Sequence, residues 1–453
     1  MSDLRRALAD RRRDFVPAPG GLERLVRRRR RRVRNRRIEA GVLALLVTAG
    51  GTWAALRAVG GLTQPVPNPS TLDASNVGDL RLAWSAPIGN ARIPAPPVVA
   101  DDTVYVSSDS GVEAFPASCR SRLATCPPLW TGQTGPSTAG QPPSTPVVAD
   151  GVVYVSSDRL YAFAAHCGTE GAACEPLWTS SGPGWPFSGV AVDGGTVYVG
   201  ADRLYAFPAA CPTTTCAPQW VSAQGVGSPG FYTPRIAGGV VYAASGDGLF
   251  SFPTRCGGDG SVCRPLWKFP FGDLGEPAVD DGLLYVVGGI ATSERSANLE
   301  AFPVPCSNLQ TCHPEWTASP GPGDALSPPV VADGVVYVSA DRLYAFSTHC
   351  AAGGRTCRPL WMGPTQVRAG SATPWAWTPP VVQGDLVFSS TDRVYAFAAS
   401  CASGGKVCRP LWVGPPDPKG FGLSTPAVTD RAVLAASAQG VLYAYELPGQ
   451  GRP

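Results

Sequence analysis

The sequence predicts an all-β protein, an eight-bladed β-propeller of four-stranded antiparallel blades preceded by a single transmembrane helix. Three observations lead to this fold. The 453-residue chain has 53 Gly and 47 Pro but only 16% charged residues, a composition typical of many short strands joined by turns. A strand-rich unit recurs eight times. An uncharged apolar stretch, at the short end of the range for a membrane span, lies ahead of these repeats.

The repeat unit reads PVVADGVVYVSSDRLYAF at Pro146–Phe163. The run PVV predicts a short first strand, ADG a tight turn, the alternating VVYVSS a second strand and RLYAF a third. A fourth strand begins at the PLW that follows. Four strands in a repeat of this length are typical of a propeller blade. The other copies begin at or near Pro97, Ser188, Pro234, Pro277, Pro329, Pro380 and Pro426.

One tryptophan marks the fourth strand of each unit, and successive ones are 42 to 51 residues apart. The first such strand, Leu80–Gly89, precedes any complete unit, whereas the last unit ends at Val441–Leu447 without one. We therefore expect the N-terminal strand to complete the last blade, which closes the ring and removes its open edges. The tryptophans are Trp84, Trp130, Trp178, Trp220, Trp267, Trp316, Trp361 and Trp412.

From about Leu80 to Leu447 the units resemble the PQQ-like (quinoprotein) propeller repeat family. The resemblance implies eight blades, with the tryptophan of each outer strand docked between neighbouring blades. The D-A-x-T-G hairpin that usually precedes this tryptophan is missing from seven units, where a cysteine loop replaces it. The dehydrogenases of the family need a quinone, a calcium ion held by Glu and Asn, a catalytic Asp and usually adjacent cysteines. This chain has no adjacent cysteines and lacks their large insertions, so it resembles the non-catalytic members.

The 14 cysteines form seven local pairs, each of which brackets the link between a third strand and the tryptophan strand. Such positions lie at the mouth of a hairpin, within disulfide range, so we expect seven structural disulfides and an oxidising compartment. Three histidines adjoin cysteines, but no unit has the four-ligand spacing of a zinc site, and no C-x-x-C redox motif occurs. The expected bridges are Cys119–Cys126, Cys167–Cys174, Cys211–Cys216, Cys256–Cys263, Cys306–Cys312, Cys350–Cys357 and Cys401–Cys408.

The charge of the chain is unevenly placed, with a net charge of +11 in residues 1–37 and −8 in the remainder. We expect a basic cytoplasmic segment at 1–37, a transmembrane helix at 38–58, a linker containing Pro and Gly at 59–79, the propeller at 80–447 and a disordered tail at 448–453. The positive-inside rule then places the propeller outside the plasma membrane. The excess of Arg over Lys suggests a bacterium with a GC-rich genome.

The basic head has two alternative interpretations. A cleaved signal peptide also places basic residues before an apolar run, and Arg36-Arg37 loosely resembles a twin-arginine signal. The head is long for a signal peptide, however, and has no convincing cleavage site. Nucleic-acid binding is the second alternative, although membrane topology and attraction to anionic headgroups explain the Arg run more simply. We expect a single-pass anchor and no nucleic-acid partner.

Propeller geometry sorts the loops onto two faces. The ADG turns and the disulfides should share one face, with the linker, while the longer loops after each tryptophan occupy the other. Aromatic residues in those loops predict a binding surface, or they fill gaps between blades. Arg235 and Glu276 depart from the apolar pattern near the innermost strands and are expected to pair, structurally or at the mouth of the channel. The candidate binding residues are Trp185, Phe187, Phe231, Tyr232, Arg235, Glu276, Trp375 and Trp377.

The sequence thus predicts a non-catalytic binding or scaffolding propeller, tethered to the membrane, that takes a protein or small ligand on the face opposite the disulfides. No nucleophile–base constellation and no phosphate loop occurs in the sequence, so we expect no catalytic residue, cofactor or metal. Two alternatives are a PQQ-dependent dehydrogenase and a cell-surface sensor that signals through the basic head.

Overall fold

The predicted head at 1–37, the predicted transmembrane helix at 38–58 and most of the tail at 448–453 lie outside the described part of the chain. No helix among the described residues is long and apolar enough to cross a membrane. The computed structural model describes residues 71–89, 95–109, 111–119, 125–135, 144–181, 188–223, 225–226, 230–257, 260–269, 275–288, 298–304, 313–320, 326–350, 355–365, 378–401, 406–417 and 422–448.

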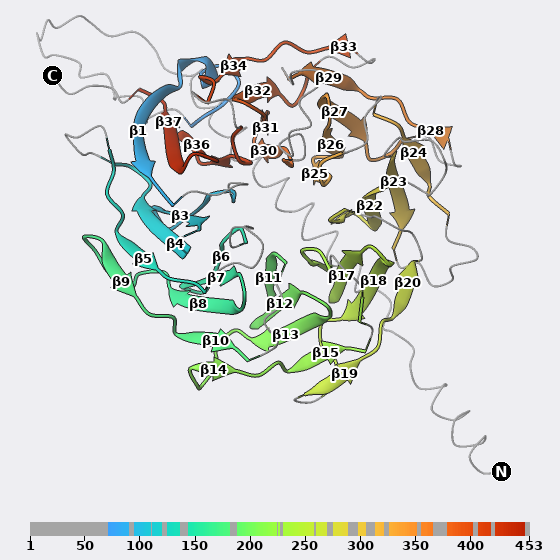
Figure 1. The fold of residues 1–453 in the computed structure, drawn as a ribbon. Helices are drawn as coiled ribbons and strands as arrows, with labels where there is room; N and C mark the ends of the chain where they lie inside the picture. Colours follow the sequence, from blue (N-terminus) through green and yellow to red (C-terminus); the bar gives the residue numbers. More distant parts are fainter. Residues whose placement is uncertain are drawn as a thin grey trace, which may run out of the picture. The chain divides into compact units, whose positions relative to one another are not determined.

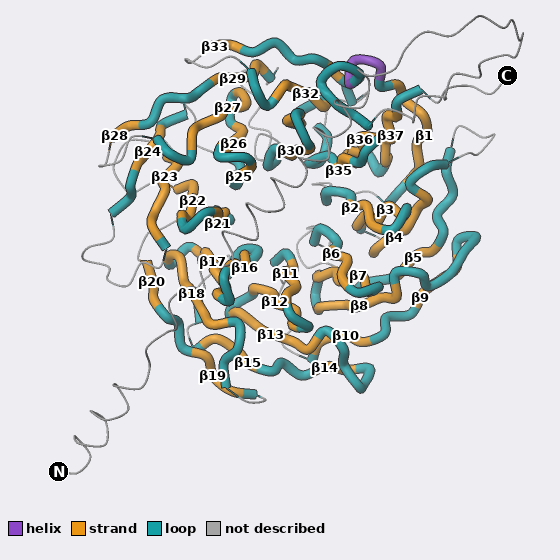
Figure 2. Tube along the Cα trace, turned by 180° about the vertical axis from the view of Figure 1, so that it is seen from behind, coloured by secondary structure: helices purple, strands orange, loops and turns teal. Residues whose placement is uncertain are grey.

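Eight sheets form a ring, as the repeats predict (Figure 1). Each blade has four antiparallel strands, and its first strand contacts the first strands of both neighbouring blades, so these strands surround the axis (Figure 2). The first strands of blades 1 to 8 are β2 (Val98–Ala100), β6 (Val147–Ala149), β11 (Val190–Asp193), β16 (Arg235–Ala237), β21 (Ala278–Asp280), β25 (Val330–Ala332), β30 (Val381–Gln383) and β35 (Ala427–Val428).

The second and third strands form the long hairpin of each blade. The second strands are β3 (Thr103–Ser108), β7 (Val152–Ser156), β12 (Thr196–Gly200), β17 (Val240–Ser245), β22 (Leu283–Gly288), β26 (Val335–Ser339), β31 (Leu386–Ser390) and β36 (Ala432–Ser437). The third strands are β4 (Gly111–Pro116), β8 (Leu160–Ala164), β13 (Leu204–Pro208), β18 (Gly248–Pro253), β23 (Asn298–Pro303), β27 (Arg342–Ser347), β32 (Val394–Ala398) and β37 (Val441–Glu446).

The fourth strands lie at the rim, and each contains the tryptophan of its unit. They are β5 (Trp130–Gly132), β10 (Trp178–Ser180), β15 (Trp220–Ser222), β20 (Trp267–Phe269), β24 (Trp316–Ala318), β29 (Trp361–Pro364), β34 (Trp412–Val413) and, in blade 8, β1 (Arg81–Pro87). Strand β1 pairs antiparallel with β37, as Figure 1 shows in blue and red. This pairing confirms that the N-terminal strand completes the last blade.

The links between first and second strands share one face of the ring with the links that follow the third strands. In all eight blades, the residue after the third strand donates its N–H to the turn between the first two strands. In blade 2 the Ala165 N–H reaches the Gly151 carbonyl at 2.9 Å. Asp150 and Gly151 have φ values of 49° and 74°, a left-handed conformation that favours Asp and Gly. We call this face the turn face and the opposite one the loop face.

The hydrophobic core lies between the blades. Eight clusters of buried side chains, one at each joint between blades, combine the tryptophan of one blade with strands of the next. At the joint of blades 1 and 2, the Trp130 ring lies 6.0 Å from Tyr105 of its own blade and 6.1 Å from Phe163 of the next. Alternating strands place successive side chains against opposite neighbours, so each blade contributes to two clusters.

Six of the seven expected disulfides lie in the described residues and have the expected local pairing, with Cα–Cα distances of 5.6 to 6.2 Å. Cys306 and Cys312 lie outside these residues. Sequence reasoning did not anticipate that the loops reach back to the preceding blade and add a parallel strand to its tryptophan strand. A bridge from Thr125 to Ser85 of β1 does the same for the first loop. The added strands are β9 (Ala172–Cys174), β14 (Thr215–Cys216), β19 (Ser261–Cys263), β28 (Arg355–Thr356) and β33 (Lys406–Val407).

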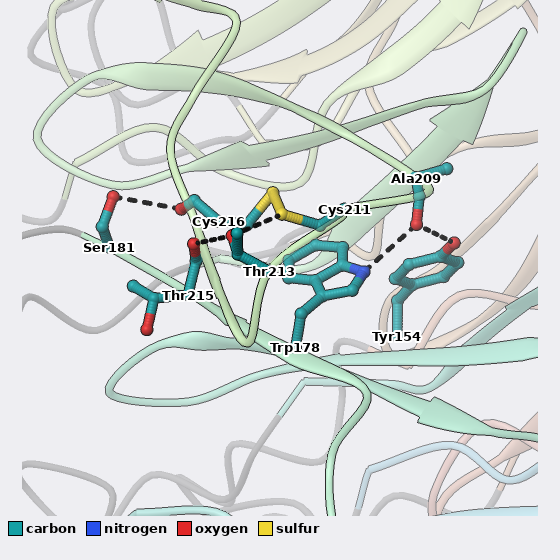
Figure 3. Close-up of a disulfide and its surroundings, with 8 residues drawn as sticks. All are labelled: Tyr154, Trp178, Ser181, Ala209, Cys211, Thr213, Thr215 and Cys216. Atoms are coloured by element: carbon teal, nitrogen blue, oxygen red, sulfur yellow. Dashed lines mark hydrogen bonds between the residues drawn. A yellow bond between two sulfur atoms is a disulfide. The ribbon is translucent and has the colours of Figure 1, made fainter.

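We call each disulfide-closed loop with its added strand a cysteine clip. Figure 3 shows the clip between blades 2 and 3, closed by the Cys211–Cys216 bridge. Beside it, the carbonyl of Ala209 accepts hydrogen bonds from the Tyr154 hydroxyl at 3.2 Å and the Trp178 indole N–H at 3.1 Å. The clip therefore lies on the same joint as the buried tryptophan and connects two neighbouring sheets.

The joint between blades 7 and 8, which we call the seam, is built differently because unit 8 has no cysteine pair. In every other unit the second cysteine stands four residues before the tryptophan, and Leu80 has this position before Trp84. Residues 71–80, which include the 3-10 turn η1 (Val77–Asp79), pack at the seam instead. The Leu72 side chain joins the same buried cluster as Leu80 and Trp412.

Backbone N–H groups of this segment donate hydrogen bonds to both blades. The Leu72 N–H reaches the Asp430 carbonyl of blade 8 at 2.6 Å, and the Ala74 N–H reaches the Asp385 carboxylate of blade 7 at 3.2 Å. Residues 71–79, expected to belong to the linker, therefore pack as part of the ring.

Candidate functional site

Four of the eight candidate binding residues lie outside the described part of the chain. The other four belong to blades 4 and 5 and lie near the ends of innermost strands. The residues outside are Trp185, Phe187, Trp375 and Trp377, and those described are Phe231, Tyr232, Arg235 and Glu276.

Phe231 fills a gap between blades and is not an exposed binding residue, since only 2% of it is accessible. Its ring packs edge-on against Phe250, with a centroid distance of 5.2 Å. Gly230 makes this turn possible, because its φ is 93° and a Cβ there would lie 2.6 Å from the carbonyl oxygen of Ala201. The structure therefore supports the gap-filling interpretation for this aromatic residue.

Arg235 and Glu276 form an ion pair between blades 4 and 5. The guanidinium Nη2 lies 2.8 Å from the carboxylate Oε2, and the two side chains are 43% and 26% exposed. Arg235 opens β16, and Glu276 stands two residues before β21, so the pair lies at the loop-face ends of two adjacent first strands. Among the described residues it is the only ion pair that joins two blades. Half-buried Tyr232 lies three residues before Arg235.

The turns between second and third strands add charge to the same face. In three blades these turns carry an Asp–Arg ion pair between sequence neighbours, with nitrogen–oxygen distances of 3.1 to 3.8 Å. In three blades, two of which have the ion pair, an Asp in the turn accepts a hydrogen bond from the tyrosine three residues later, as Asp202 does from Tyr205 at 3.0 Å. Burial, and then this hydrogen bond, raise the pKa of Tyr205 to about 12. These tyrosines stay neutral at physiological pH and act as donors to the turns.

The eight expected docking tryptophans lie at the joints, and all except half-buried Trp267 are buried. Five of them donate the indole N–H to a carbonyl of the next blade at 3.0 to 3.4 Å. Trp84 instead donates to the Glu446 carboxylate at 3.0 Å. These contacts position the blades and leave the tryptophans out of the accessible site.

The histidines beside the cysteine pairs, His166, His313 and His349, are exposed on their loops. No group of three or more His, Cys, Asp or Glu within the described ranges is arranged to hold a metal ion. Every described cysteine is bonded to its local partner, and no two are adjacent in sequence. These residues offer no donor set for a metal centre.

Sequence reasoning missed a small cavity at the seam, beside the loop that follows β34. Its volume is about 140 Å³ and its walls include Pro416, Asp417 and Tyr443. The Pro-Pro-Asp run at 415–417 was the available signal, because two prolines remove two backbone donors from a loop that faces a joint.

Comparison with models of known protein families and with curated protein sequences gives no match. Solved structures do match. BamB from Moraxella catarrhalis has 15% identity and a TM-score of 0.52, with 83% of this chain and 99% of that chain covered. Sqt1 from Saccharomyces cerevisiae has 10% identity and a TM-score of 0.54, covering 84% and 99%. Quinohemoprotein alcohol dehydrogenase from Comamonas testosteroni has 13% identity and a TM-score of 0.56, covering 84% and 78%. The fold is a β-propeller.

At these identities the likeness concerns the fold alone, and binding of a quinone cofactor would depend on the residues present in this chain. The expected donor set would be a calcium ligand group of Glu and Asn with adjacent cysteines. The described part of the chain offers neither a metal-ligand cluster nor adjacent cysteines. The described residues therefore do not fit the cofactor.

Proposed function

We propose that this protein is a non-catalytic binding scaffold, displayed outside the cytoplasm on its membrane anchor, which takes a protein partner on the loop face. The observation that carries the proposal is the ion pair of Arg235 and Glu276. At its exposure such a pair contributes on the order of 0–1 kcal/mol to folding. It nevertheless places a positive and a negative group side by side at the axial end of a rigid ring, where a partner surface contacts both.

The test is site-specific photo-crosslinking in membranes with the full chain. A benzophenone amino acid at Tyr232 should capture one discrete partner. The same probe at Asp333, an exposed turn-face residue, serves as the control and should not capture it. Arg235→Glu should abolish capture because it places two acidic groups together. The double exchange of Arg235→Glu with Glu276→Arg should restore folding stability but not capture. Equal capture from both faces, or capture by the Arg235→Glu variant, would contradict the proposal.

A quinoprotein dehydrogenase is the second candidate, because a quinohemoprotein alcohol dehydrogenase shares the fold. Adding PQQ and calcium to the purified protein distinguishes the two functions. A quinone absorption band together with reduction of a dye by an alcohol would establish the enzyme and remove the scaffold proposal. The scaffold proposal expects neither signal.

A further inference from the structure

The seam contains a cavity of about 140 Å³. It lies between the loop after β34 in blade 7 and strands β37 and β1 of blade 8. Leu82 of the rim strand β1 is 54% exposed. Tyr445 and Asp417 are buried, with exposed fractions of 3% and 5%. The residues that line the cavity include Leu82, Pro415, Pro416, Asp417, Tyr443 and Tyr445.

The joint of blades 1 and 2 explains why the seam is hollow. There the loop after the tryptophan strand closes onto the next blade, because the Gly135 N–H donates to the Tyr161 hydroxyl at 2.7 Å. Tyr443 holds the matching place in blade 8, but Pro415 and Pro416 in the facing loop have no N–H. The Asp417 N–H turns back to its own blade and reaches the Asp392 carbonyl at 2.7 Å. The Asp417 N–H is therefore not donated to Tyr443, and the cavity lies between this loop and the tyrosine.

The walls combine aromatic rings with one carboxylate. Tyr443 and Tyr445 lie side by side, with ring centroids 6.5 Å apart and an interplanar angle of 28°. Burial raises the pKa of Tyr445 to about 12, with further contributions from Tyr443 and the Asp417 charge. Burial, and then the Asp417 charge, also raise the pKa of Tyr443. A carboxylate has two oxygens with several acceptor sites, so Asp417 can receive a ligand in addition to its present contacts.

We propose that the seam cavity binds a small organic cation, an alkylammonium group held between the tyrosine rings and the Asp417 carboxylate. Aromatic faces attract cations, and a buried carboxylate disfavours anions while it compensates a cation taken out of water. A cavity of this volume accepts about five or six non-hydrogen atoms, because cavities near 150 Å³ hold benzene. A free quaternary ammonium and the side-chain end of a lysine both match this chemistry. The site is separate from the loop-face ion pair and does not depend on it.

The experiment titrates the full-length protein with tetramethylammonium, with N-acetyl-lysine amide and with tert-butanol as the neutral isostere, at constant ionic strength. Saturation-transfer NMR and tyrosine fluorescence report binding. Asp417→Asn removes the charge and keeps the shape, and Asp333→Asn removes the same charge from the turn face as its matched control. Leu82→Trp blocks the cavity from an exposed position without altering the buried core. Melting temperatures of all variants report folding.

We expect saturable binding of at least one cation, no binding of tert-butanol, a loss of tenfold or more in Asp417→Asn, and loss of the signal in Leu82→Trp. Asp333→Asn should bind as the parent does. The tighter of the two cations identifies the source, a lysine of a partner or a free quaternary amine. Equal binding of tert-butanol, unchanged affinity in Leu82→Trp, or no cation binding at all would overturn the proposal. If Asp417→Asn fails to fold, Leu82→Trp decides the outcome.

Discussion

Two joints of the ring are held together by different contacts. They are the clipped joint of blades 2 and 3 and the seam of blades 7 and 8. At the clipped joint the Ala209 carbonyl accepts from Tyr154 and Trp178, and a disulfide closes the strand that crosses between blades (Figure 3). At the seam Phe388 replaces the tyrosine, so one donor is lost.

Trp412 packs edge-on against Tyr445 at 5.3 Å, and its indole N–H makes no hydrogen bond with another described residue. The seam therefore depends on apolar packing and on the hydrogen bonds of residues 71–80, whereas the clipped joints have a covalent closure. We therefore expect the seam to open first when the packing of residues 71–80 is weakened.

The largest expected effect comes from removing that packing. The double variant Leu72→Ala and Leu80→Ala truncates two buried side chains at the seam, each worth about 2–5 kcal/mol. We expect early unfolding, with hydrogen exchange accelerated first in β35, β36 and β37. Asp79→Ala, an exposed change in the same segment, is the control and should be nearly neutral. Exchange that begins equally at all eight joints would show that the seam is not the weak one.

Loss of one cysteine clip should lower the free energy of unfolding by less than the double leucine variant does. Cys167→Ala with Cys174→Ala removes a loop closure worth about 2–3 kcal/mol, a value that depends on the chain-entropy model. Chemical denaturation should show this loss, and exchange should rise in β9 and β5 while the seam stays unchanged. In the parent protein, a reducing agent should weaken the clipped joints but not the contacts of residues 71–80.

Much of this architecture could be predicted, and the reasons are specific. Closure followed from the tryptophan strands, because Leu80–Gly89 had no other blade to join. Local disulfides followed from sevenfold recurrence. The crossing of each clip could not be predicted, because two cysteines define a loop but not the strand edge that receives it. The buried position of Phe231 could not be predicted either, because it depends on the left-handed φ of Gly230. The cavity at the seam depends on a joint between repeats that no single repeat encodes.

Glycines two residues after the tryptophan allow a finer comparison of the joints. A Cβ on Gly132 would lie 2.7 Å from the buried Phe163 ring of the next blade, so Gly132→Ala should destabilise the protein by about 1–3 kcal/mol. Gly414 has the same position at the seam, where the nearest atom is 3.0 Å away in Trp412 of its own blade. Gly414→Ala should cost less, under about 1 kcal/mol. Denaturation midpoints measure both losses of stability. A larger loss for Gly414→Ala than for Gly132→Ala would show that this position is packed more tightly at the seam than at the joint of blades 1 and 2.

The smallest effect concerns two glutamates that replace the tyrosine of the third strand. Glu113 accepts hydrogen bonds from the Ser108 hydroxyl and the Gly89 N–H, each at 3.0 Å. Glu300 is 5% exposed, no donor in the described residues reaches its carboxylate, and burial raises its pKa above the usual 4.5.

A raised carboxyl pKa means that the folded state binds the proton more tightly than the unfolded state. The contribution of Glu300 to stability is therefore fully present below pH 4.5 and is lost as pH rises through its raised pKa. We expect Glu300→Gln to match the parent at pH 4 and to exceed it slightly at pH 7. Glu113→Gln should instead lose stability at pH 7, because it replaces a charged acceptor that holds two donors. Melting temperatures from pH 4 to 8 measure both, and a Glu300→Gln curve parallel to that of the parent would rule out this carboxyl as the source of the pH dependence.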